Sequence, residues 1–194
     1  MAIWDVKIVL EYLSSLENVS KLDLKMLTLK LTMLLCLVTA QRSLTLHLLK
    51  FSNMISEGQN IIFTISDLVK QSSVRFKAPI IKLRPYADKA LCVTTALHEY
   101  LSRSKDLRKQ VDNLFISYAR PHLAVTKNTS RWIKSMLETA GIIISIYKSH
   151  SIRAAASTAM KENSFPVEEI LRTAGWSNVQ TFGKFYIAKF HIAK

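Results

Sequence analysis

Apolar residues recur at helical spacing along most of this chain. The first such segment follows Asp5, whose carboxylate suits the N-cap of a helix with apolar residues at positions 8, 9, 12, 13 and 16. A longer segment, residues 22–40, is apolar on nearly every face, and Ser20 with Asp23 resembles a capping box at its start. The pattern predicts two helices, the second of them at the centre of the core.

The helical spacing is interrupted by a stretch that is typical of a small antiparallel sheet. Ile55 and the run of residues 60–65 predict two strands joined by a turn. Residues 75–83 offer a third strand, which Pro79 restricts to a sheet edge because proline lacks the N–H of a central strand. We therefore expect a three-stranded antiparallel sheet.

The remaining helical patterns are shorter, and two of them are followed by Gly141 and Gly175, which suit left-handed helix ends. The predicted helices are 43–49, 88–102, 129–139, 150–161, 166–173 and 178–189. The apolar segment 114–117 has no clear period, and its state stays open. The predicted fold class is α+β, helix-dominated, in a single domain over residues 1–194.

The charge of the chain points to a polyanionic partner. There are 27 Lys and Arg residues against 14 Asp and Glu, a formal net charge of +13. The cations are spread over the whole chain and are not gathered in a tail. This balance suits a folded surface that grips a nucleic-acid duplex, and an ordinary solvated surface is the alternative explanation.

The two cysteines, Cys36 and Cys92, stand in apolar helical settings with no His or Cys at ligand spacing. We expect buried structural thiols and a reducing compartment. No secretory signal opens the chain, and its most hydrophobic stretch, residues 31–40, is too short to span a bilayer. Neither a carboxylate cluster for Mg²⁺ nor a Gly-rich phosphate loop is present, so no metal or cofactor is expected.

The candidate chemistry lies mainly in the last quarter of the chain. His150 and Arg153 stand three apart at the start of a predicted helix, where they share a face and free amides favour a phosphate. Trp176 follows, and Tyr186 ends a compact aromatic segment. Arg42, from the other half, comes after a buried helix, where a charge needs an anion or a carboxylate. Taken singly, each has an ordinary alternative: a chance pair, a core aromatic or a salt bridge.

Together, these segments resemble the tyrosine recombinases, and most closely those of Crypton and DIRS-type eukaryotic mobile elements. The resemblance runs over nearly the whole chain and is densest in the carboxyl-terminal motifs. The segments that carry it are Trp4-Asp5, Ala40-Gln-Arg-Ser-Leu-Thr-Leu46, Leu91-Cys-Val93, Leu114-Phe-Ile-Ser117, Thr129-Ser-Arg-Trp-Ile-Lys134, Ser149-His-Ser-Ile-Arg-Ala-Ala-Ala156, Ala174-Gly-Trp-Ser177 and Thr181-Phe-Gly-Lys-Phe-Tyr186.

The resemblance implies a DNA strand-transferase that cleaves and rejoins DNA without a metal or ATP. Tyr186 would be the nucleophile, giving a 3′-phosphotyrosyl link and a free 5′ hydroxyl. Arg42 and Arg153 would bind the non-bridging oxygens, and Trp176 would donate its indole N–H to them. His150 would assist proton transfer or hydrogen-bond the phosphate.

Lys70, in the polar segment between the second and third predicted strands, matches the family's mobile lysine, the acid for the departing 5′ oxygen. Lys77 and Lys82 follow in the same hairpin, and one of them takes this role if the strand register is shifted. The resemblance also implies double-stranded DNA as the partner, a synaptic oligomer on that DNA and a nuclear location. No separate N-terminal core-binding domain is expected in residues 1–194.

Two other functions stay open. A non-catalytic, domesticated DNA-binding module would keep the fold and the charge without turnover. A structural helical protein that binds no DNA would leave both the charge of +13 and the ordered motifs as coincidences. The presence of every matched site residue favours the enzyme over the module, because decay is expected to remove at least one of them.

Overall fold

The structure, a computed structural model, describes residues 3–65 and 80–175 of the 194-residue chain. Within these residues it has seven α-helices and one three-stranded antiparallel sheet, so the predicted helix-dominated α+β fold class is confirmed. In chain order the elements are α1 (Val6–Ser15), α2 (Leu24–Thr39), α3 (Ser43–Leu46), a 3₁₀ turn (Phe51–Asn53), β1 (Met54–Glu57), β2 (Asn60–Thr64), β3 (Ile80–Leu83), α4 (Val93–Ser104), α5 (Thr129–Thr139), α6 (Ser151–Glu162) and α7 (Val167–Ala174).

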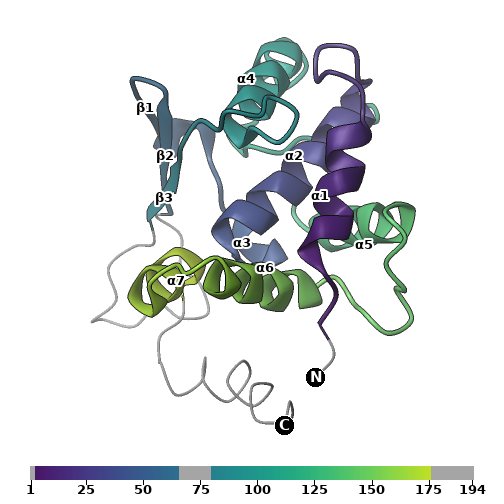
Figure 1. Ribbon diagram of the computed structural model, residues 1–194. Coiled ribbons are helices and arrows are strands. Elements are labelled where there is room, and N and C mark those ends of the chain that lie inside the picture. The colour runs from purple at the N-terminus through teal and green to yellow at the C-terminus, as the bar shows by residue number, and fades with distance from the viewer. Residues whose placement is uncertain (1–2, 66–79, 176–194) are drawn as a thin grey trace, which may run out of the picture.

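Helix α2 forms the centre of the fold, as its apolar pattern predicted. Every side chain from position 27 to position 37 is buried, and α4, α5 and α6 pack around the helix (Figure 1). Its start differs from the prediction: Asp23 is itself the N-cap, and its carboxylate accepts from the Met26 N–H at 2.6 Å. The predicted capping box of Ser20 and Asp23 is wrong, because Ser20 is hydrogen-bonded to Asn18 in the preceding turn.

Helix α1 is capped by Asp5 as predicted and buries Val9 and Leu13. Ile8, which the periodicity placed on the apolar face, is exposed, since it is turned about 100° around the helix axis from Val9. The fully buried Lys30 of α2 donates from Nζ to the Leu13 carbonyl oxygen at 2.9 Å, and desolvation lowers the pKa of this lysine. The bond joins the end of α1 to α2.

The sheet lies on one side of the helices, with β2 between β1 and β3 (Figure 1). Side chains 61 and 63 of β2 and 81 and 83 of β3 turn into the core, in the alternation that a half-buried sheet requires. The predicted strand, turn and strand over residues 55–65 are confirmed, and the turn uses a positive φ of 59° at Gly58. Of the predicted strand 75–83, the structure describes residues 80–83; Pro79, Lys70 and Lys77 lie outside the described residues.

Helix α4 begins five residues later than predicted, at Val93 instead of Asp88. The Asp88 carboxylate accepts from the Ala90 N–H at 2.8 Å, which closes a separate turn before the helix. The N-cap of α4 is Cys92. The prediction placed the start of the helix at Asp88 because an aspartate that caps a short turn has the same sequence signature as one that caps a helix.

The segment 114–117, whose state the sequence left open, is a buried extended connection. The Ile116 N–H donates to the Tyr100 hydroxyl at 3.0 Å, and residue 116 forms an isolated antiparallel bridge with Ala124. The Phe115 ring lies 5.7 Å from the Tyr100 ring and 5.9 Å from the Trp132 ring, centroid to centroid. The segment therefore links α4 to α5 through an aromatic cluster.

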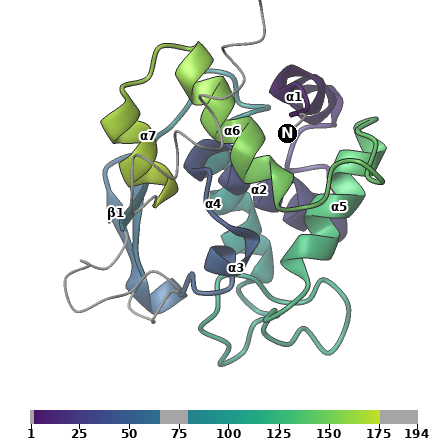
Figure 2. The same ribbon diagram turned by 90° about the horizontal axis from the view of Figure 1, so that it is seen from below.

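The carboxyl-terminal helices follow their sequence patterns closely. Helix α5 has the predicted bounds, and α6 and α7 lie within one residue of theirs. Helix α3 is shorter than the predicted 43–49, because residues 47–49 form successive turns. Helix α6 lies against α2, and α7 continues from it toward the sheet (Figures 1 and 2). The predicted helix 178–189 lies outside the described residues.

Both cysteines are buried, as predicted. Burial raises the pKa of the Cys36 thiol to about 12, which suits an inert structural thiol. Burial also acts to raise the pKa of Cys92, but hydrogen bonds with Thr94, Thr95 and the Tyr86 N–H outweigh it and lower that pKa to about 7. Of the two thiols, Cys36 alone has the pKa expected of an inert group.

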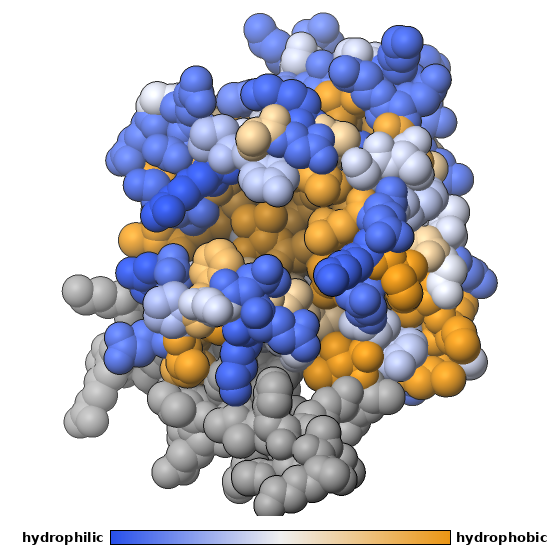
Figure 3. All heavy atoms as spheres, viewed as in Figure 1, coloured by the Kyte–Doolittle hydropathy of each residue, from blue (hydrophilic) through white to orange (hydrophobic). Residues whose placement is uncertain are grey.

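The surface carries large apolar side chains on several elements. Figure 3 shows apolar side chains across the middle of one face, with polar side chains gathered above them around α4. The most exposed are Leu44, Ile55, Ile80, Tyr86, Leu123, Ile143 and Ile146. None of the described helices has both the length and the apolar content needed to cross a bilayer.

Candidate functional site

Arg42 stands in the tight connection between α2 and α3. Ala40 ends α2 in the left-handed conformation, with φ 48°, and its N–H donates to the Cys36 carbonyl oxygen at 2.9 Å. The Gln41 N–H donates to the Thr39 hydroxyl at 3.2 Å, which closes the turn that presents Arg42. These bonds fix the backbone on which the first candidate arginine is carried.

The Arg42 side chain is exposed, and this differs from the buried charge that the sequence predicted. No carboxylate among the described residues forms an ion pair with it. Because the Arg42 guanidinium is hydrated, it needs no carboxylate partner to offset a cost of desolvation. The exposed position leaves Arg42 accessible to an external anion.

Arg153 is buried on α6, with 7% of its surface exposed. Its Nη1 donates to the Ala174 carbonyl oxygen at 2.6 Å and to the Ala40 carbonyl oxygen at 3.3 Å. Ala40 lies two residues before Arg42, and Ala174 lies two residues before Trp176. One nitrogen of Arg153 therefore joins the two segments from which other candidate residues arise.

A second bond joins the same two segments. Gln41, 5% exposed, donates from its side-chain Nε2 to the Thr173 carbonyl oxygen at 2.6 Å. Gln41 stands within the Ala40–Leu46 motif and had no predicted role. The sequence holds no signal for it, because its burial and its carbonyl partner become visible only in the folded chain.

His150 occupies the N-cap position of α6, and its side chain is exposed. The next residue, Ser151, accepts a hydrogen bond at 2.9 Å from the indole Nε1–H of Trp4, which is 5% exposed. The first two amides of α6 are not free as the sequence predicted, because the Ser151 and Ile152 N–H groups donate to the Lys148 and Ser149 carbonyl oxygens at 2.8 Å and 3.5 Å. The positive end of the helix dipole still favours an anion there. His150 and Arg153 therefore lie at the same end of α6, where His150 is exposed to solvent and Arg153 is buried.

His47, a histidine with no role in the predicted site, lies beside the Arg42 segment. His47 Nε2 is 2.5 Å from the Thr129 hydroxyl, which itself donates to the Ser43 carbonyl oxygen at 3.0 Å. Because the hydroxyl proton is used on Ser43, the His47 ring donates from Nε2 to Thr129. Burial lowers the pKa of His47, so the neutral ring is favoured.

The contact between α3 and α5 joins two segments that each carry an exposed arginine. The Ser43 and Ser130 hydroxyl oxygens are 3.0 Å apart, and the chain neighbours of these serines are Arg42 and Arg131. Both arginines are exposed. The first turn of α5 therefore adds positive charge beside the Arg42 segment.

Of the three candidate catalytic lysines, Lys82 alone lies within the described residues. Lys70 and Lys77 lie outside the described residues, as do Trp176 and Tyr186. Lys82 is exposed on β3, and its Nζ lies 3.7 Å from a carboxylate oxygen of Glu57 on β1. A pair this exposed contributes little to stability and leaves the ammonium accessible.

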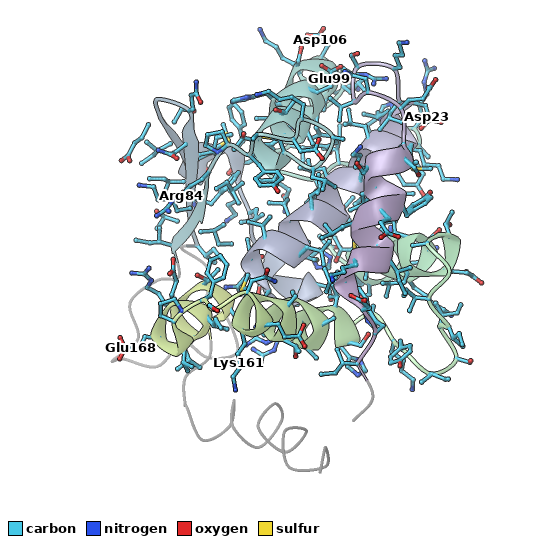
Figure 4. All side chains as sticks on the ribbon, in the orientation of Figure 1. Asp23, Arg84, Glu99, Asp106, Lys161 and Glu168 are labelled. Carbon is cyan, nitrogen blue, oxygen red and sulfur yellow. The ribbon has the colours of Figure 1, made fainter. Side chains whose placement is uncertain are left out.

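The described residues contain no group of three or more His, Cys, Asp or Glu side chains arranged to hold a metal ion. Lys161 of α6 and Arg84, just after β3, point outward (Figure 4). Among the described candidate residues, the exposed Arg42 and His150 can offer hydrogen-bond donors to an external anion, whereas Nη1 of the buried Arg153 is bonded to two carbonyl oxygens.

A known protein family covers almost the whole chain. The model of the phage integrase family matches residues 10–191 of the chain. The chain belongs to the phage integrase family. No curated protein matches this sequence.

Solved structures of tyrosine recombinases share the fold. The XerH site-specific recombinase bound to difH substrate superposes with a TM-score of 0.72 at 15% identity, covering 100% of this chain and 53% of that one. The XerA recombinase gives a TM-score of 0.66 at 20% identity, with 95% and 60% covered. A lambda integrase dimer bound to a COC′ core site gives 0.53 at 19% identity, with 93% and 45% covered. The chain thus spans about half the length of these proteins.

Proposed function

We propose that this phage integrase family chain is a DNA strand-transferase that cleaves and rejoins DNA through a 3′-phosphotyrosyl intermediate. The observation that carries the proposal is the pair of bonds from Arg153 to the carbonyls of Ala40 and Ala174. They bring the backbone that carries Arg42 and the backbone that leads to Trp176 to one guanidinium. Side chains that act on one phosphate need this kind of convergence.

In this proposal Tyr186 attacks the scissile phosphorus through its phenolic oxygen, and the bond to the 5′ oxygen breaks. The phenol proton is taken up by His150 or by water, and Lys70 gives a proton to the departing 5′ oxygen. A phenol with a pKa near ~10 is mostly protonated at neutral pH, so adjacent cations must favour its developing charge. The bond energy is retained in the phosphotyrosyl ester, and the 5′ hydroxyl reverses the step without ATP.

Arg42 and Arg153 bind the non-bridging oxygens in this proposal, because a guanidinium stays charged and offers paired donors. Trp176 adds an indole N–H to the same oxygens. The charge that builds up in the pentacoordinate transition state is then stabilised by fixed donors. Neither a metal nor a cofactor takes part in the proposed step.

Double-stranded DNA is the proposed partner. The net charge of +13 supports this, as do the neighbouring structures described as bound to a difH substrate or a core site. One of those structures is a dimer on its DNA, and we extend the proposal to self-association of this chain in a synaptic complex. The resemblance to Crypton and DIRS-type recombinases supports a mobile-element origin and a nuclear location.

The proposal is tested with a pool of nicked duplexes whose sequence is randomised around the nick. Covalently linked strands are recovered under denaturing conditions and sequenced, which also reveals the preferred site. We expect adducts with the wild-type chain in the absence of divalent metal and none with Arg42→Ala. Gel retardation without any adduct would instead establish the non-catalytic DNA-binding module.

A further inference from the structure

Gln41 joins two parts of the chain that are 132 residues apart. Its side-chain nitrogen lies 2.6 Å from the Thr173 carbonyl oxygen in the last turn of α7. The direction of this bond is fixed by chemistry, because only the NH₂ half of an amide can donate to a carbonyl. The opposite amide orientation would place two oxygens against each other.

The backbone of Gln41 is held as firmly as its side chain. Its N–H donates to the Thr39 hydroxyl, and that hydroxyl donates to the Leu35 carbonyl oxygen at 2.6 Å. Gln41 is therefore tied to the last turns of α2 on one side and to the end of α7 on the other. A buried residue that is bonded through both its backbone and its side chain has little freedom to move.

The two ends of this connection adjoin candidate site residues. Arg42 follows Gln41 directly, and Trp176 follows Thr173 by three residues. Between them Gly175 ends α7 in the left-handed conformation, with φ 65°, and its N–H donates to the Arg172 carbonyl oxygen at 3.3 Å. The place where the chain leaves α7 is thus set by short bonds at Thr173, Ala174 and Gly175.

We propose that Gln41 is a positioning residue that sets the place of the Arg42 turn relative to the end of α7, the helix that precedes Trp176 and Tyr186 in the chain. The inference rests on the proposed strand-transfer function. Gln41 is 5% exposed, so it acts through its neighbours and does not contact DNA itself. Its loss should slow the chemical step and leave the affinity for DNA almost unchanged.

The test compares Gln41→Met with Gln110→Met. Methionine keeps the length and bulk of glutamine but removes the donor, and Gln110 is exposed in the connection after α4. Adduct formation is followed at saturating concentrations of the randomised nicked duplex pool, and affinity is measured by gel retardation. A displacement of about 1 Å at a reacting group costs on the order of 10²-fold in rate, which sets the scale of the expected effect.

We expect Gln41→Met to form adducts about 10-fold to 100-fold more slowly at saturation, with a Kd within about twofold of the wild-type value. Gln110→Met should match the wild type in both quantities. A Gln41→Met variant with unchanged rate would overturn the inference, as would a rate that falls only because affinity falls.

A readout that does not depend on activity separates this inference from the proposed function. Amide hydrogen exchange over residues 171–175 should be faster in Gln41→Met than in Gln110→Met, while exchange in α2 stays the same. If the wild type forms no adduct, the proposed function fails, and unchanged exchange over residues 171–175 would then refute the connection made by Gln41 as well. Faster exchange there, together with the slower adduct rate, supports the inference in full.

Discussion

Arg153 donates from Nη1 to the carbonyl oxygen of Ala174 at 2.6 Å. The same nitrogen reaches the Ala40 carbonyl oxygen at 3.3 Å. A side chain proposed to bind the scissile phosphate therefore also holds together the ends of α2 and α7. Stability and activity are coupled at this residue, and they are separable at others.

Arg153→Lys should lower both the stability of the fold and the rate of adduct formation. Lysine keeps the charge but lacks the planar guanidinium, so it cannot donate to the two carbonyl oxygens and to a phosphate at the same time. We expect the free energy of unfolding to fall by about 2 kcal/mol, measured by urea denaturation, and adduct formation to be lost. Arg131→Lys, at an exposed arginine of α5, is the matched control and should change stability little. Equal stability of Arg153→Lys and the wild type would show that the carbonyl bonds contribute nothing.

The bond from Trp4 to Ser151 should hold the start of α6, where His150 stands. Trp4→Phe removes the donor and Ser151→Ala removes the acceptor. Each variant should lower the free energy of unfolding by about 1 kcal/mol, with an added packing cost for the smaller ring of Trp4→Phe.

A double-mutant cycle isolates the bond itself from that packing cost. The coupling energy between the two changes should be about 1 kcal/mol, because the second removes nothing once the first has been made. Strictly additive effects in urea denaturation would mean that the contact does not stabilise the fold.

His47 should make the protein less stable in acid. Burial lowers the pKa of His47 in the folded chain, whereas the unfolded chain takes up this proton near pH ~6.5. Below that pH the unfolded state binds more protons, so the free energy of unfolding falls as pH falls toward the folded pKa. Urea denaturation from about pH 8 to about pH 5 should show a smaller loss in His47→Gln than in the wild type. Parallel curves would assign the acid sensitivity to other groups.

Cys92 should react with thiol reagents before Cys36. Its pKa of about 7 gives a thiolate fraction that rises through neutral pH, while the Cys36 pKa of about 12 keeps that thiol protonated. Both are buried, so modification follows local opening of the fold and stays slow. Peptide mass mapping after brief alkylation should find Cys92 labelled faster as pH rises from about 6 to about 8. Earlier labelling of Cys36 would contradict the hydrogen bonds assigned to Cys92.

The helices with one clear apolar face could be predicted from the sequence. Helix α5 has the predicted bounds because Trp132, Ile133, Met136 and Leu137 repeat at helical spacing and Gly141 follows its end. The start of α4 was missed because the Asp88 turn imitates an N-cap. Asp23 was assigned the wrong position for a similar reason: a carboxylate three residues after a serine fits a capping box or a cap of its own.

The candidate site residues are a prediction from the sequence, and the bonds that hold Arg153 could not be predicted from it. Arg42 and Arg153 stand out by their chemistry, whereas the bonds of Arg153 to Ala40 and Ala174 join residues 113 and 21 positions away. Backbone carbonyls carry no sequence signal, so no pattern could reveal these acceptors. The exposure of Arg42 was also not predictable, because it depends on the left-handed turn at Ala40.

Tyr186 is the residue that we expect to form the covalent link to DNA. The most direct measurement is mass spectrometry of the adduct from the nicked duplex pool after nuclease and trypsin digestion. The tryptic peptide of residues 185–189 contains Tyr186 and should carry the nucleotide mass. Tyr186→Phe should form no adduct, while Tyr86→Phe, at an exposed tyrosine after the sheet, should form as much as the wild type. An adduct that persists in Tyr186→Phe, or a nucleotide mass on another peptide, would contradict the account.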